Sequence, residues 1–438
     1  MTLFLGVSCL TTFAGPIHAL LQTTRPDRQR IEAIIRKLTV PEFNGRAFKT
    51  EGGFKAAGYI AKLFSEVGLR FVQKPEAPIV TRSSYLSLFP GGGAIVFGMI
   101  EGRDAGLKNE YVIVGAHYDG FGEGFVGAMD NAAGVAVMIE IARALAKNPP
   151  QRSVLFIAFD GGEQQQARAN FYAEHPIIPP DTTAAMINLS GFGGGMSEQL
   201  YETLYVIGSE SSPQLREAVG KHKRGEAHLA MVGRDVMRWP GGEHFLFTLK
   251  QTPTITITNG VHYSQHSKAD TPDRINYAAL EKHVAALTKV IAEVANTPGK
   301  VEKSPEPVFD KDEPMEWHRV LTALRENVLK TPENDAGQAR IDDVLLELKR
   351  HQGRAAQDPK AREAVILRAA NIAFYIANPN GVEYNSLLNQ ARNYEESGQR
   401  QQAIAAYRKL LKFIEEEYRR DDQTVGEIRA RLLKLSGK

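Results

Sequence analysis

The sequence predicts a three-layer αβα sandwich with a mostly parallel mixed sheet, followed by an all-α C-terminal domain. Two observations lead to this fold class. Up to residue 296, short apolar runs rich in β-branched residues alternate with stretches of helical periodicity, which is typical of strands buried on both faces of a sheet. Beyond residue 314, nearly every segment is built from helix formers. The length of 438 residues is enough for two or three domains.

Residues 1–22 are predicted to be a signal peptide or an N-terminal membrane anchor. No Lys, Arg, Asp or Glu occurs in the first 24 residues, the run from Leu3 to Ala14 is mostly apolar, and Ala19 closes a candidate cleavage site. We therefore expect the protein to be exported, either to a periplasm or out of the cell. No later run reaches 18 consecutive apolar residues, so no membrane association beyond this anchor is expected.

The α/β domain is expected over residues 26–296. Its first part, 28–69, carries apolar residues at helical spacing, and 132–147 reads as a helix between two strands. In parallel sheets the functional residues gather in loops at the carboxyl ends of the strands. The predicted strands are 94–100, 111–116, 154–159, 184–189 and 252–258.

A linker is expected at 297–314, where prolines and charges accumulate, and a helical domain at 315–438. Leu387, Ala391, Tyr394, Tyr407 and Leu410 lie close to the spacing of one tetratricopeptide helix-turn-helix unit. A small helical bundle with an aromatic core explains the same pattern. In either case these helices are a candidate surface for a protein partner.

The composition limits the kinds of partner and of metal site that this chain can have. Lys and Arg total 53 against 51 Asp and Glu, which argues against binding nucleic acid along the whole chain. The single cysteine, Cys9, lies in the leader, so neither an intrachain disulfide nor a cysteine-based zinc site can form. Any metal ion must be held by histidines and carboxylates.

Four polar segments follow predicted strands. His117 with Asp119 follows the second strand, Asp130 opens the next helix, Glu163 follows the third strand, and His266 follows the last. Asp130 could be an ordinary helix cap, and each residue alone is more often structural. Together they form a His, Asp and Glu set suited to zinc, and two zinc ions sharing a carboxylate can activate water and polarise a carbonyl.

In this order, these segments resemble metallopeptidase family 28, the cocatalytic zinc aminopeptidases and their glutaminyl-cyclase relatives. The resemblance implies that His117 binds one zinc ion, that Asp130 bridges both ions through a loop with a cis peptide to Asn131, and that Glu163 and His266 complete the other ion's ligands. Asp119 matches the acid that supports the ligands. The resemblance lies in segments 44–46, 101–104, 116–119, 130–134 and 269–273.

The sequence departs from the family at two positions of the site. The family has two adjacent glutamates after the third strand, a general base and then a zinc ligand, whereas this chain reads Gly162-Glu163-Gln164. The flanking sequence favours Glu163 as the ligand, with Gly162 at the position of the missing base. In the other register, Glu163 is the base and Gln164 replaces the ligand. Ser190 stands where the family has an aspartate ligand, and a hydroxyl binds zinc more weakly than a carboxylate.

One zinc site therefore keeps its full set, Asp130, Glu163 and His266, while the second keeps His117 and Asp130, with Ser190 as a poor third ligand. Tyr263 is a candidate for contacting the substrate or an oxyanion, and Asp160 and Glu243 are further candidates for replacement groups. The first interpretation is an exported zinc metallopeptidase-like protein of the aminopeptidase type, acting on peptide or aminoacyl bonds and impaired by these losses. Alternatives are an inactive pseudopeptidase that serves as a binding module and a mono-zinc, glutaminyl-cyclase-like acyltransferase.

Overall fold

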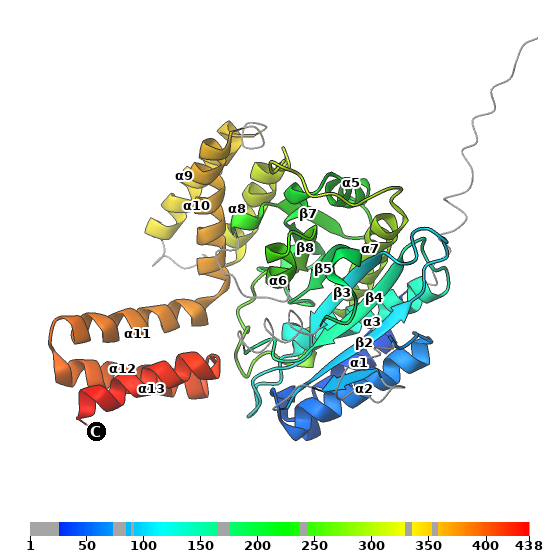
Figure 1. The fold of residues 1–438 in the computed structure, drawn as a ribbon. Coiled ribbons are helices and arrows are strands. Elements are labelled where there is room, and N and C mark those ends of the chain that lie inside the picture. The colour runs from blue at the N-terminus through cyan, green and yellow to red at the C-terminus, as the bar shows by residue number, and fades with distance from the viewer. Residues whose placement is uncertain are drawn as a thin grey trace, which may run out of the picture.

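The computed structural model describes residues 26–72, 85–88, 92–164, 176–236, 244–328, 335–352 and 358–437 (Figure 1). The predicted leader at 1–22 and Glu243 lie outside these residues. Within the described part of the chain, no helix is both long and apolar enough to cross a membrane.

The α/β domain is built on an eight-stranded mixed sheet with the order β1-β2-β4-β3-β5-β8-β6-β7. Strands pair in parallel at β3/β4, β3/β5, β5/β8 and β6/β7, and antiparallel at β1/β2, β2/β4 and β6/β8. The mostly parallel mixed sheet predicted from the sequence is thus confirmed. The strands are β1 (Leu86–Leu88), β2 (Ala94–Ile100), β3 (Tyr111–His117), β4 (Ser153–Phe159), β5 (Thr183–Leu189), β6 (Thr203–Ile207), β7 (His228–Val232) and β8 (Thr254–Thr258).

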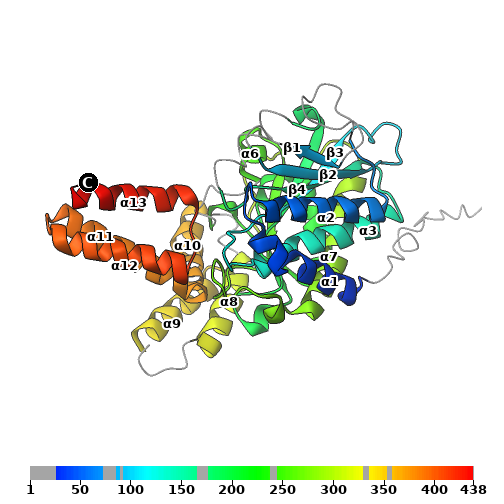
Figure 2. The ribbon, with the colours of Figure 1, turned by 90° about the horizontal axis from the view of Figure 1, so that it is seen from below.

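One face of the sheet is covered by helices that share the largest core (Figure 2). Alternate strand residues such as Val112 and Val114 point into this core, as the two-residue period of a strand requires. Helix α3 lies against β3 and is buried nearly throughout its length, in keeping with its largely apolar sequence. The helices on this face are α1 (Arg28–Leu38), α2 (Glu51–Val67), α3 (Ala133–Ala146), α5 (Pro213–Lys221) and α7 (Tyr277–Asn296).

The opposite face is covered in two parts. Around β2, β3 and β4, Phe247 of α6 (His244–Leu249) joins the apolar residues of the sheet. Near the β6–β7 edge, Tyr205 and Val232 instead pack against the first helices of the C-terminal region. Trp317 of α8 (Glu313–Val328) stacks on Tyr205 with ring centroids 6.3 Å apart. These helices therefore supply the third layer at this edge of the sheet.

A buried ion pair fastens the same helices to the α/β domain. Nε of Arg362, in α10 (Pro359–Ala377), lies 3.0 Å from Oε2 of Glu313 in α8, and both side chains are almost fully buried. Oε1 of Glu313 accepts a hydrogen bond from the Gly233 amide after β7, and Arg362 also pairs with Asp235. Burial raises the pKa of the Glu313 carboxyl, although the charge of Arg362 opposes the shift.

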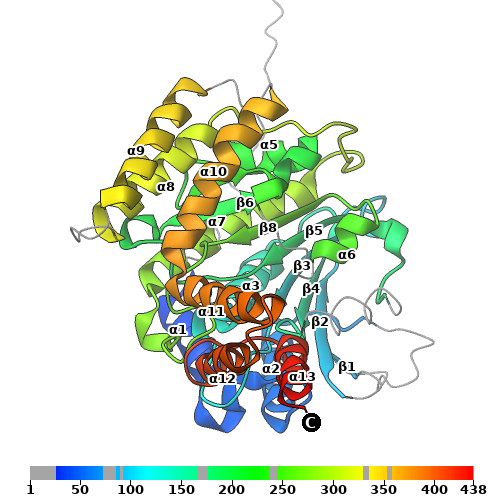
Figure 3. The same cartoon turned by 90° about the vertical axis from the view of Figure 1, so that its left-hand side faces the viewer.

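The last three helices have a core of their own, in which Tyr407 and Leu410 are fully buried. Helices α11 and α12 form a helical hairpin whose turn contains Gly398, at a φ of 73° that suits glycine. Figure 3 shows this group in front of the α/β domain. Its tetratricopeptide character and the division at 297–314 stay predictions. The remaining helices are α9 (Asp335–Arg350), α11 (Pro379–Glu396), α12 (Arg400–Glu416) and α13 (Asp422–Ser436).

Candidate metal centre

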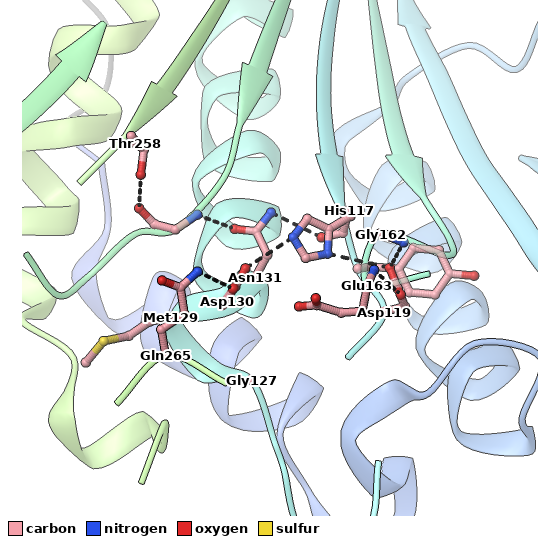
Figure 4. A network of polar contacts seen from close by, with 12 residues as sticks. His117, Asp119, Gly127, Met129, Asp130, Asn131, Gly162, Glu163, Thr258 and Gln265 are labelled. Carbon is pink, nitrogen blue, oxygen red and sulfur yellow. Dashed lines mark hydrogen bonds and ion pairs between the residues drawn. The ribbon is translucent and has the colours of Figure 1, made fainter. Parts of the chain in front are cut away.

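The predicted site residues converge at the carboxyl ends of the parallel strands (Figure 4). His117 is the last residue of β3, Glu163 lies in the loop after β4, and His266 in the loop after β8. Asp130 lies in the irregular turn 128–132 that leads into α3. Since β3, β4, β5 and β8 run parallel, their carboxyl ends meet at one edge of the sheet.

The Asp130 carboxylate lies between two imidazoles. Its Oδ1 is 3.2 Å from Nε2 of His117, and its Oδ2 is 3.3 Å from Nε2 of His266. Glu163 completes the group, with Oε2 3.6 Å from Nε2 of His266. Candidate ligand atoms of His117, Asp130 and Glu163 all lie within 4.8 Å of one another. Each oxygen of Asp130 thus faces a different nitrogen donor, as a carboxylate shared by two ions would.

Burial and mutual charge shift the protonation of these groups. Burial opposes ionisation of Asp130, but hydrogen bonds from His117 and His266 outweigh it and hold its pKa well below the usual range. Burial and the Asp130 charge raise the pKa of Glu163 to about 7. Burial lowers the pKa of His266, yet the charges of Glu163 and Asp130 overcome this and raise it to about 9. A metal ion that binds here at neutral pH therefore displaces a proton from His266.

Hydrogen bonds from neighbouring loops fix the position of Asp130. The carboxylate of Asp270 accepts from the amides of Met129 and Asp130 at 2.8 and 3.1 Å. Nε2 of Gln265 donates to Oδ2 of Asp130 at 3.0 Å. A cis peptide joins Asp130 to Asn131, and the Asn131 amide group donates to the carbonyls of His117 and Leu189.

Asp119 ties the end of β3 to the loop after β4. It is fully buried, and its carboxylate accepts hydrogen bonds from the amides of Gly162 and Glu163, the latter at 2.9 Å. Its Oδ1 also lies 3.5 Å from Nδ1 of His117. Asp119 therefore orients a histidine and a glutamate of the cluster at the same time.

Comparison with known proteins finds a family whose model matches the part of the chain that carries this cluster. Residues 96–291 match the model of peptidase family M28. The α/β domain, which contains this match, is called the M28 domain below. The match covers the strands and loops that carry His117, Asp130, Glu163 and His266, so the M28 domain contains the whole candidate centre.

Relatives of the M28 domain include proteins named as proteases and one named as a complex subunit. A probable zinc metalloprotease of Pyrenophora teres f. teres is 32% identical over 118 residues, 25% of this chain and 25% of that protein. The BOS complex subunit NCLN of Homo sapiens is 24% identical over 299 residues, 60% of this chain and 51% of that protein. The chain thus spans about a quarter to a half of the length of these relatives.

Solved structures share the fold of the M28 domain. LapB from Legionella pneumophila superposes with a TM-score of 0.53 at 18% identity, over 64% of this chain and 75% of LapB. BSAP, a zinc aminopeptidase from Bacillus subtilis, superposes with a TM-score of 0.50 at 15% identity, over 63% of this chain and 97% of BSAP.

Gly162 packs directly against His117 of the candidate metal centre. A Cβ atom added to Gly162 would lie 2.3 Å from Cγ and 2.3 Å from Nδ1 of His117, far inside van der Waals contact. The atoms it would meet belong to the root and ring of His117, not to the end of a flexible chain. In this conformation the loop after β4 therefore has no space for any side chain at position 162.

We expect Gly162→Ala to displace His117 and to destabilise the M28 domain by about 1–3 kcal/mol, the usual cost of overpacking. Thermal unfolding of the zinc-free protein measures this loss. Gly58→Ala is the matched control, because its added Cβ in helix α2 meets no atom within 4 Å. Equal melting temperatures for the two variants would contradict the close contact.

Among the described residues, Ser190 and Tyr263 form no hydrogen bond with Asp130. Ser190 follows β5, and its amide donates to the carbonyl of Ile257 at 3.1 Å. Among the described residues, its Oγ makes no hydrogen bond to the cluster. Tyr263 is half exposed, and its hydroxyl accepts a hydrogen bond from Arg274. The proposed substrate role of Tyr263 and ligand role of Ser190 stay predictions.

Two residues that support the site in the M28 domain, Gln265 and Arg46, were not predicted from the sequence. Gln265 contacts Asp130, and the only local signal was its place beside His266. Arg46 is fully buried and donates to the carbonyls of Leu38, Tyr118, Val126 and Gly127, thereby holding the loops after β3 together. Arg46 lies in segment 44–46, one of those that carry the family resemblance. That resemblance was the signal that could have identified it as a residue that supports the loops.

Proposed function

We propose that the chain is an exported zinc metallopeptidase-like protein of the aminopeptidase type, with impaired hydrolysis of peptide or aminoacyl bonds. The observation that carries this proposal is the position of Asp130 between two histidines, with Glu163 beside them. The export rests on the sequence of residues 1–22.

The donor set fits zinc. Two imidazoles and two carboxylates from the chain at and after β3, β4 and β8 approach one another in a nearly buried cluster, and such mixed nitrogen and oxygen sets bind zinc well. Asp130, Glu163 and His266 would hold one ion. His117 and the other oxygen of Asp130 would hold a second ion only weakly, because Ser190 supplies no carboxylate. Bound zinc supplies a Lewis acid for a carbonyl and lowers the pKa of water.

Hydrolysis is expected to be impaired because the other carboxylates near the site already accept hydrogen bonds from backbone amides. Gly162 cannot accept a proton. Asp119 accepts two amide hydrogen bonds, and Asp160 accepts those of Ala94 and Gly161. Among the described residues, neither carboxylate is available in the place of the base. Loss of a positioned base lowers the rate by about 10²- to 10⁴-fold.

A second candidate is a non-catalytic binding module. It is supported by the relative that aligns over 60% of this chain, which is named for its place in a complex and not for an activity. In this case the zinc cluster stabilises the domain, and partner binding involves the C-terminal helices.

Zinc per chain, measured by elemental analysis on protein purified without chelators and supplied with trace zinc, tests the proposal. We expect one tightly held ion, its loss in His266→Ala, and its retention in the control His222→Ala at the end of α5. Slow, zinc-dependent release of amino acids from aminoacyl p-nitroanilides would favour the impaired peptidase. Zinc binding with no turnover would favour the binding module, and a zinc-free wild-type chain would overturn both.

A further inference from the structure

The turn between α12 and α13 contacts all three strand-end loops of the candidate centre. The amide of Arg419 donates to the carbonyl of His266 at 2.8 Å, after β8. The guanidinium of Arg419 lies 3.4 Å from the Glu123 carboxylate, after β3. The amide of Asp422 donates to Oε1 of Gln164 at 3.3 Å, after β4. A segment about 150 to 300 residues away in sequence is therefore docked on the site.

His266 lies between two aromatic rings from different parts of the chain. Phe121, from the loop after β3, approaches the imidazole edge-on at 4.9 Å between centroids. Tyr418, from the C-terminal turn, stacks on it at 5.7 Å with an interplanar angle of 29°. The exposed fraction of the His266 side chain is 19%. Both ring contacts restrict the rotation of the imidazole.

A hydrogen bond to the second ring nitrogen does not fix the orientation of the His266 imidazole. A metal-binding histidine generally donates its second ring N–H to a carboxylate or carbonyl, which sets the ring orientation. Nδ1 of His266 is buried and has no hydrogen-bond partner among the described residues. The backbone of His266 is also unusual, with a φ of 58°, and its carbonyl is held by the Arg419 amide. Ring stacking and this one hydrogen bond replace the missing partner.

Tyr418 is itself held firmly by the C-terminal helices. It is 4% exposed and belongs to the core of α11–α13, where it contacts Tyr384 at 6.0 Å and Phe413 at 6.3 Å between ring centroids. Asn378 donates to its hydroxyl at 3.4 Å. The position of Tyr418 is therefore set by the packing of these helices.

We propose that Tyr418 and Arg419 are positioning residues for His266, so that the docked α11–α13 helices complete the zinc site of the M28 domain. The proposal rests on the zinc site proposed above and assigns a role to helices that the family match does not include. Movement of these helices away from the domain would free the imidazole and weaken zinc binding. The affinity for zinc thus reports whether the helices are docked.

Tyr418→Leu in the full chain tests this role, because leucine keeps apolar volume in the helical core but removes the aromatic face over His266. We expect zinc affinity, measured by competition with a chromophoric chelator, to fall about tenfold, as for loss of other groups that orient a ligand. Tyr418→Phe should restore wild-type affinity. Tyr407→Leu is the matched control, since Tyr407 is buried in the same core but, among the described residues, makes no ring contact with Tyr418. Its affinity should stay near wild type.

A second measurement needs no zinc. Acylation of His266 by diethyl pyrocarbonate, followed by mass spectrometry on the zinc-free chain, should be faster in Tyr418→Leu than in wild type and Tyr407→Leu. If the wild type binds no zinc, the proposed function fails, and this reactivity alone decides the positioning role. Equal zinc affinities or equal His266 reactivities in Tyr418→Leu and Tyr407→Leu would overturn the inference.

Discussion

Asp130→Asn should abolish the thermal stabilisation of this protein by zinc. The wild-type chain at a free zinc concentration 100 times its dissociation constant gains about 2.7 kcal/mol by linkage. Asparagine keeps the shape of the side chain but removes the negative charge that faces both His117 and His266. Because Asp130 serves both halves of the cluster, its loss removes zinc binding at either position.

The measurement is the melting temperature with and without zinc, in wild type and variant. Asp273→Asn is the matched control, because the Asp273 side chain is 77% exposed and belongs to the same segment as Asp270. The control should keep the full zinc-dependent shift. A zinc-dependent shift of wild-type size in Asp130→Asn would show that the ion binds elsewhere.

Arg362→Ala should destabilise the protein by about 3–5 kcal/mol, the usual cost of removing one partner from a buried ion pair. The substitution leaves the Glu313 carboxylate buried among apolar side chains without its counter-charge. Because Glu313 also accepts the Gly233 amide, the damage should reach the end of β7. We expect the first thermal unfolding transition to move to a lower temperature.

Arg368→Ala provides the comparison, since Arg368 pairs with Glu347 on the surface with 54% of its side chain exposed. Exposed pairs of this kind contribute about 0–1 kcal/mol. The double variant Arg362→Ala/Glu313→Ala should recover part of the loss by removing the stranded charge. Similar melting temperatures for Arg362→Ala and Arg368→Ala would show that the buried pair does not fasten α8 and α10 to the sheet.

Local patterns were sufficient to predict much of the α/β domain. Runs of six or seven residues, apolar or rich in β-branched side chains, predicted β2, β3, β4, β5 and β8, because such runs are typical of strands buried on both faces. The strands β6 (TLYVI) and β7 (HLAMV) were not predicted. Each has only five residues, and such short runs are common inside helices. The edge strand β1 has three residues and carries almost no pattern.

The candidate site was predictable to the extent that strand ends determine it. His117, Asp130, Glu163 and His266 each follow a strand or open a helix, and the parallel sheet brings such positions together. The contact of Gly162 with His117 was not predictable, because it depends on the path of the loop in space. The contact of Tyr418 with His266 also lies beyond local patterns, since it joins residues of different domains.

The cover on the β6–β7 edge also has a consequence for the order of events during synthesis. Val232 leaves the ribosome roughly 130 residues before Val365 of α10, which belongs to the last helix of the same core. At 5–20 residues per second, the apolar face of this edge waits about 7–26 s for its cover. The nascent chain therefore carries an incompletely covered apolar surface through this interval. A stop codon before residue 313, where α8 begins, would leave that surface permanently open to aggregation or to chaperones.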